Sequence, residues 1–173
     1  MKLTHIKIRS IEQKDTQERH EFFLNLAKAK EGMISTPEEI GFNSYDTQEQ
    51  IAYFLSIQNS LWLIAEYENK IIAEIDIIRY QAQKLNHVGK LTIGVLPTFQ
   101  SMGLGSVLMQ KALDWAIINN LKRLELFVFK SNIKAQNLYK KFGFVIEGER
   151  KNFIKLDNTT YENDFLMARY LFS

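Results

Sequence analysis

The stretch that decides the fold is Gln100-Ser101-Met102-Gly103-Leu104-Gly105. It follows an apolar, strand-like segment at 91–95 and precedes an amphipathic, helix-like segment at 104–118. Glycines at the entry to a helix remove side chains, so unpaired backbone N–H groups and the positive end of the helix dipole can face one anion. The pattern therefore predicts a phosphate-binding loop whose natural ligand is a diphosphate.

The segments ahead of this loop change from helical to strand periodicity along the chain. We expect a strand at 5–9 and a helix at 15–31, followed by an irregular segment at 35–46 that forms a loop over a cleft. A second helix is then capped by Asp46 or Thr47. Strands 61–67 and 71–80 form an antiparallel hairpin around a turn at 68–70, which leads to the strand at 91–95.

Strands and helices alternate after the loop. We expect the helix at 104–118, an apolar strand at 124–129, a helix that begins at Ser131-Asn132 and ends at Gly143 with Ala135, Leu138 and Phe142 inward, and strands at 144–147 and 165–171. These elements predict an α+β fold: a mixed, mostly antiparallel twisted sheet of about six or seven strands, about four flanking helices and one parallel crossover at the glycine loop.

The composition excludes several classes of function. The chain has 173 residues, which predicts a single domain over 1–173, and its net charge of +2 gives no reason to expect a nucleic-acid partner. It has no cysteine, which excludes thiolate nucleophiles and fits a cytoplasmic location. The segment 1–7 lacks the apolar core of a signal peptide, and no apolar run is long enough to span a membrane. His5 and His20 are expected at the surface, and three scattered histidines predict no metal site.

Two blocks of residues resemble the GCN5-related N-acetyltransferase (GNAT) superfamily over about 71–171. The acetyl-CoA signature of that family is matched by Gln100, Gly103 and Gly105. Its second block is matched by Asn132, Ala135, Leu138-Tyr139 and Gly143-Phe144. The ending Glu147-Gly148-Glu149-Arg150, followed by Tyr161, Asp164 and Met167, is similar to the branch that acetylates amino groups of small molecules or protein N-termini.

The resemblance implies a binding site for acetyl-CoA as co-substrate, with no metal. The pyrophosphate would be held at Gln100, Met102, Gly103, Leu104, Gly105 and Ser106, and the pantetheine arm at the backbone of Ile93 and Val95. The arm would enter where strand 91–95 splays from strand 124–129; an ordinary strand end before Pro97 is the alternative. Asn132 is a good helix N-cap by itself, and the resemblance adds a coenzyme contact. Tyr139, two helical turns later, would be the general acid that protonates the leaving thiolate.

The residue that accepts the proton of the attacking amine is ambiguous in the sequence. Glu74 and Asp76 share one face of a strand beside the expected acceptor cleft, and Glu74 is our candidate. Glu66, His87 and Glu125 are alternatives, and a strand carboxylate that simply faces solvent is the commoner case.

We therefore predict an acetyl-CoA-dependent N-acetyltransferase that transfers the acetyl group by direct attack in a ternary complex, since no cysteine can carry it. The acceptor would be a primary amine on a small molecule or peptide, in a pocket shaped by segment 33–45 and the hairpin beyond Ile71. A non-catalytic acyl-CoA-binding sensor or scaffold and a nucleotide-binding α/β domain are the alternatives. Homodimers are common in the family, so a homodimer is compatible with this prediction.

Overall fold

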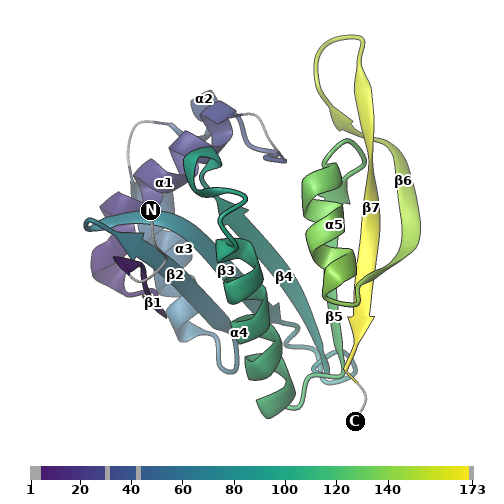
Figure 1. The fold of residues 1–173 in the computed structure, drawn as a ribbon, viewed down its shortest axis with the longest axis horizontal. Coiled ribbons are helices and arrows are strands. Elements are labelled where there is room, and N and C mark those ends of the chain that lie inside the picture. The colour runs from purple at the N-terminus through teal and green to yellow at the C-terminus, as the bar shows by residue number, and fades with distance from the viewer. Residues whose placement is uncertain (1–4, 30–31, 42–43, 172–173) are drawn as a thin grey trace. The chain divides into compact units, whose positions relative to one another are not determined.

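The computed structural model describes residues 5–29, 32–41 and 44–171, and its elements are labelled in Figure 1. The chain forms two compact units. The first unit contains the chain up to Ile78 together with Thr92–Trp115, and the second contains Arg79–Leu91 and the chain from Ala116 onward. The expectations for 1–4, and for the residues 30–31 and 42–43 inside longer segments, lie outside the described residues.

Seven strands form a mixed sheet in the order β1-β2-β3-β4-β5-β7-β6. The strands are β1 Lys7–Ser10, β2 Leu61–Tyr67, β3 Lys70–Arg79, β4 Val88–Val95, β5 Arg123–Phe129, β6 Val145–Lys155 and β7 Tyr161–Tyr170. The α-helices are α1 Thr16–Ala29, α2 Pro37–Ile40, α3 Tyr45–Ser56, α4 Leu104–Ile118 and α5 Ile133–Lys141. Strands β4 and β5 pair in parallel, whereas the β1–β2, β2–β3, β5–β7 and β6–β7 pairs are antiparallel. The predicted α+β fold with a mixed, mostly antiparallel sheet is confirmed.

The β2–β3 hairpin of the first unit forms where the sequence predicts it. Glu68 and Asn69 connect the strands with φ angles of 50° and 60°. Two consecutive left-handed residues give a turn whose twist matches that of the strands, and asparagine tolerates this conformation better than most residues. The hairpin packs into an apolar core made by Ile11, Phe22, Leu26, Ile51, Phe54, Trp62, Ile64 and Ile71.

Three predictions for the first unit are wrong in detail. The irregular segment contains α2, whose N-cap Thr36 shares reciprocal side-chain to backbone hydrogen bonds with Glu39. Helix α3 begins at Tyr45, so Asp46 and Thr47 lie inside its first turn instead of capping it. His20 is not at the surface: it is only 4% exposed, and its Nδ1 lies 3.3 Å from the Thr47 hydroxyl.

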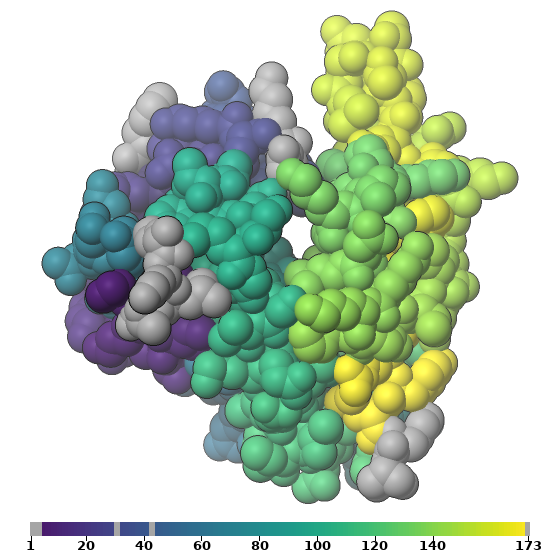
Figure 2. Space-filling model, in the orientation of Figure 1, coloured from purple at the N-terminus to yellow at the C-terminus, as the bar shows by residue number. Residues whose placement is uncertain are grey.

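The second unit differs from the prediction mainly in its strand lengths. β4 begins at Val88, three residues before the expected start, and β6 and β7 are each longer than predicted. They form a hairpin whose tip projects past α5 within this unit (Figures 1 and 2). Asp157 closes its turn by accepting the N–H groups of Thr159 and Thr160, which lowers the pKa of Asp157 to about 2.

The inward face of α5 also differs from expectation. Gln136 and Tyr139 are its buried residues, whereas Ala135, Leu138 and Phe142 are half-buried. Gln136 is buried because its side-chain amide donates to the carbonyls of Phe129 and Lys130, which polar and apolar periodicity does not reveal. Over the described part of the chain, no helix has both the length and the apolar character needed to cross a bilayer.

Candidate functional site

The glycine loop of the first unit has the backbone that the sequence predicts. Ser101 and Gly103 have φ angles of 60° and 86°, and α4 begins at Leu104. The Gly103 carbonyl accepts the N–H of Val107 at 3.1 Å, so Gly103 stands at the N-cap position. A Cβ on Gly103 would meet no atom within 4 Å. Glycine is therefore favoured here by backbone conformation and not by packing.

The loop is attached to the end of β4. The side-chain amide of Gln100 donates to the Val95 carbonyl at 3.2 Å, and the N–H of Leu96 donates to the Ile72 carbonyl of β3 at 3.0 Å. Gln100 therefore connects the strand end to the loop, a role that is independent of any ligand. Ile93 and Val95 are half-buried on β4.

The first turn of α4 presents its backbone at this loop. Leu104 is buried, whereas Met102, Gly105 and Ser106 are half-buried. The first amides of a helix have no carbonyl one turn earlier to bond, and the helix dipole adds positive potential at the same end. Left-handed residues within a tight loop also direct successive N–H groups to one side, an arrangement that binds anions. The geometry suits a phosphate group without a lysine or arginine side chain.

Asn132 and Tyr139 lie in the second unit, on α5. The Asn132 Oδ1 accepts the N–H of Ala135 at 3.1 Å, which confirms the predicted N-cap. The cap uses the oxygen of the side-chain amide and not its nitrogen. Tyr139 is 7% exposed, and its ring centroid lies 6.0 Å from that of Phe144. Burial raises the pKa of Tyr139 above its usual value, so the phenol stays protonated and can act as a proton donor.

The parallel ladder between β4 and β5 is short. It joins Val88 to Arg123, Gly89 to Leu124 and Lys90 to Glu125, all within the second unit. On its other edge β5 pairs with β7 along its whole length, from Arg123 to Phe129.

Glu74 lies in a buried cluster of the first unit and does not face solvent. Its two carboxylate oxygens accept the Nε and Nη2 groups of Arg19, each at 3.3 Å, and Oε2 also accepts the indole N–H of Trp62 at 3.1 Å. The exposed fractions of Glu74 and Arg19 are 5% and 6%. Sequence reasoning missed Arg19 as the partner. Glu74 as the proton acceptor stays a prediction, and these contacts favour a structural role.

The other candidate bases have different surroundings. Glu66 pairs with Arg9 at 2.7 Å, and Glu125 accepts hydrogen bonds from Tyr80 and Arg123. Asp76 is half-buried and His87 is exposed. Within the described ranges no three His, Asp or Glu side chains are grouped so that they could hold a metal ion.

Comparisons with known proteins find relatives that are named N-acetyltransferases. The L-amino acid N-acetyltransferase AaaT of Escherichia coli (strain K12) is 32% identical over 111 residues, which is 62% of this chain and 66%, just under two thirds, of the relative's length. The ribosomal protein bS18-alanine N-acetyltransferase of Haemophilus ducreyi is 30% identical over 145 residues, 80% of this chain and 100% of the relative.

Solved structures share the fold across almost the whole chain. A GNAT-family acetyltransferase from Streptococcus pneumoniae superposes with a TM-score of 0.87 at 28% identity, covering 96% of this chain and 99% of the other. The Salmonella typhimurium protein yncA, solved with its cofactor acetyl-CoA, superposes with a TM-score of 0.79 at 14% identity. The superposition covers 96% of this chain and 94% of the other, and at this identity it shows only that the two share a fold. Residues 21–144 match the model of the acetyltransferase (GNAT) family. The chain belongs to this family.

Proposed function

We propose that this protein is an acetyl-CoA-dependent N-acetyltransferase that transfers an acetyl group to a primary amine. The observation that carries the proposal is the loop at Gly103, a left-handed residue with open space beside it that begins α4 in a chain of the GNAT family. An anion-binding helix start of this kind suits the pyrophosphate of coenzyme A.

The residues around the loop fit the coenzyme. We assign the pyrophosphate to the backbone amides of 102–106 and to Gln100, and the pantetheine arm to the backbone of Ile93 and Val95. We assign further coenzyme contacts to Asn132, whose amide nitrogen is not used by the cap, and to Tyr139. The relative yncA, solved with acetyl-CoA, supports this choice of co-substrate.

The reaction would be a direct attack of the amine on the acyl carbon. Acetyl-CoA supplies the activated acyl group, and the chain has no cysteine to form a cysteinyl acyl-enzyme. The main contributions are then positioning and stabilisation of the developing oxyanion by backbone N–H groups. The buried phenol of Tyr139 would donate a proton to the leaving thiolate. A water molecule or a carboxylate would accept the proton of the amine.

The acceptor would be a small molecule or a peptide with a free amino group. The two relatives described above are named for an amino acid and for the alanine of a ribosomal protein, and both substrates present an amine. We propose that the segment 33–45, which contains α2, and the hairpin beyond Ile71 shape the acceptor pocket. A cytoplasmic location and a homodimer remain predictions.

The direct test is acetyl-CoA turnover against a library of amines, polyamines, amino acids and N-terminal peptides, measured by release of free thiol. We expect turnover with at least one class of amine. Thermal shifts with acetyl-CoA, NAD and ATP test the alternatives, because a ligand at 100 times its Kd adds about 2.7 kcal/mol of stability. Stabilisation by acetyl-CoA with no turnover of any amine would support the non-catalytic sensor. Stabilisation by NAD or ATP alone would contradict coenzyme A binding.

A further inference from the structure

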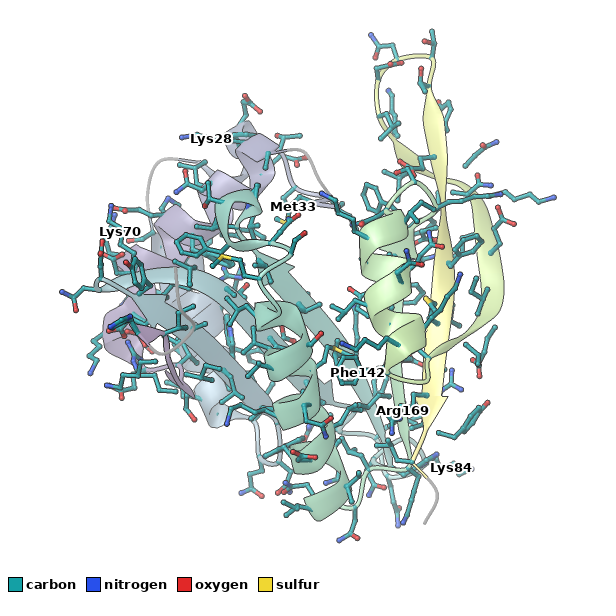
Figure 3. The ribbon with its side chains drawn as sticks, in the orientation of Figure 1. Lys28, Met33, Lys70, Lys84, Phe142 and Arg169 are labelled. Atoms are coloured by element: carbon teal, nitrogen blue, oxygen red, sulfur yellow. The ribbon has the colours of Figure 1, made fainter. Side chains whose placement is uncertain are left out.

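A group of aromatic and charged residues on the second unit lies on the face of the sheet that α5 does not cover. We call it the Phe127 cluster, and it consists of Lys90, Phe127, Arg150, Phe153 and Asp164. The covered face is identified by Arg169 of β7, which is in register with Leu124 and donates to the carbonyl of Phe142 at the end of α5 (Figure 3). Side chains alternate along a strand, so Phe127 points to the opposite face from Leu124.

Arg150 is held rigidly in this cluster. Its Nε donates to Asp164 Oδ1 at 2.8 Å, and its Nη2 donates to Oδ2 of the same carboxylate. Its Cζ lies 3.9 Å from the ring centroid of Phe127 and 3.5 Å from that of Phe153. Two rings at these distances cannot occupy the same face of a guanidinium, so they cover its two faces. Only the in-plane edge that includes Nη1 is left to donate to a ligand.

The strand β6 is shaped to make this arrangement. Residues three apart on a regular strand point to opposite faces, yet Phe153 and Arg150 meet. The β6–β7 register shifts between Arg150 and Ile154, and Asn152 has a φ angle of 52°. This irregularity brings the Phe153 ring onto the guanidinium.

Lys90 adds a second positive charge. Its Nζ lies 5.8 Å from the ring centroid of Phe127. Across the described residues, no carboxylate lies within ion-pair distance of Lys90. Glu125 faces Lys90 in the ladder, but its oxygens accept from Tyr80 and Arg123. The cluster thus has two cations and one carboxylate, and Asp164 is only 2% exposed, whereas the Arg150 side chain is 36% exposed.

The cluster lies at the end of the parallel ladder between β4 and β5. Lys90 is the last residue of β4 in the parallel ladder, and Phe127 is two residues beyond its partner Glu125. Under the proposed function, the acceptor would have to reach the backbone of β4 beyond the end of this ladder, where the pantetheine arm is assigned. Tyr139 belongs to α5, so within the second unit the cluster lies on the opposite face of β5 from this residue.

We propose that Arg150 and Lys90 bind the carboxylate of an amino-acid acceptor. The guanidinium edge would donate to the carboxylate oxygens, with its faces shielded from water by Phe127 and Phe153, and the Lys90 ammonium would supply the second charge. The exposed parts of the two rings would contact the acceptor's side chain. This inference rests on the proposed function and narrows its acceptor to amines that carry a carboxylate.

The test compares alanine, leucine, methionine and glutamine with their carboxamides, which keep the side chain and the primary amine but lose the negative charge. The amides have a less basic amine, so each variant is compared with wild type on the same substrate. A hydrogen bond to a charged group is worth roughly a tenfold change in rate or affinity. We therefore expect Lys90→Gln and Arg150→Lys to lower kcat/KM about tenfold for the amino acids and less than about twofold for the amides.

Two controls separate recognition from folding. Arg169→Gln removes an arginine from the opposite face of the sheet, leaves Glu125 paired with Arg123, and is expected to change both substrate series equally. Lys90→Gln leaves the Arg150–Asp164 pair in place, so it tests the site even if Arg150→Lys fails to fold. The inference would be overturned if Lys90→Gln lowered kcat/KM equally for amino acids and amides. It would also be overturned if the wild type acetylated only amines that are not amino acids.

The proposed function can fail separately. If wild type acetylates no amine, calorimetric titration of the amino acids and amides into wild type and Lys90→Gln still decides the question. Binding of amino acids that is stronger than that of their amides, and about tenfold weaker in the variant, would support the carboxylate site. No binding, or equal binding of both series, would overturn it.

Discussion

Glu74→Gln is the substitution that best separates structure from chemistry in the first unit. It removes the negative charge that two donor groups of Arg19 share, and both side chains are almost fully buried. Breaking a buried ion pair costs about 3–5 kcal/mol, because a charge is left without its partner. The glutamine oxygen can still accept the Trp62 N–H, so we expect the lower end, about 3 kcal/mol. For a chain of this size that is a fall in Tm of roughly 6–12 °C.

Urea unfolding and turnover, measured on the same samples, test this reasoning. The double variant Arg19→Met/Glu74→Gln contains no buried charge at the site and should recover most of the lost stability. Glu66→Gln is the matched control: it breaks a half-buried strand pair with Arg9 and should cost about 1 kcal/mol or less. An unchanged urea midpoint for Glu74→Gln would refute the energetic argument. A stable double variant that has lost about a hundredfold or more in kcat/KM would instead identify Glu74 as the proton acceptor.

Three further substitutions test the glycine loop, the phenol of Tyr139 and the carboxylate of Glu147. Gly103→Ala forces a left-handed alanine and should cost about 1 kcal/mol in urea unfolding. Gly41→Ala, at φ and ψ angles of 72° and −174° and with equally open space, should cost at least as much, about 1–3 kcal/mol, but only Gly103→Ala should weaken acetyl-CoA binding in calorimetry. Tyr139→Phe should lower kcat and leave the Kd for acetyl-CoA nearly unchanged. Because burial raises the pKa of Tyr139, the activity of the wild type should show no loss of this proton donor below about pH 10. A variant as fast as wild type would contradict the acid role. The hydrogen bond from Arg123 lowers the pKa of Glu147 from 4.5 to about 2, so its stabilisation is complete above about pH 4.5 and is lost as pH falls through about 2; the stability difference between wild type and Glu147→Gln in urea should therefore disappear below that pH.

The features that the sequence predicted correctly depend on neighbouring residues. The turn at Glu68 and Asn69 needs two residues that tolerate positive φ, and the N-cap at Asn132 needs a side-chain acceptor three residues before a free N–H. Gly103 is similar, because its own backbone conformation requires glycine. In each case the deciding interaction spans no more than a few positions, so the local pattern contains the information.

The features that were missed depend on residues far away in the sequence. The hairpin β6–β7 extends past its apolar positions because ladder hydrogen bonds and the Asp157 turn hold polar residues in strand conformation. His20 was expected at the surface from its own type, yet α3 covers it and supplies Thr47 from 27 positions later. Neither effect has a signal in the local periodicity.

Glu74 shows a signal that could have been used. Alternation along a strand predicts a solvent-facing side only when one side of the sheet is open. In β3 the residues Ile71, Ile72, Ala73 and Ile75 are all buried, so both alternating sets point into packed surroundings. A carboxylate inside such a run has no solvent face, and burying it requires a cation with matching hydrogen bonds. The apolar residues on both sides of Glu74 therefore predict a buried partner, although only the fold shows that α1 provides it, 55 positions away, through Arg19.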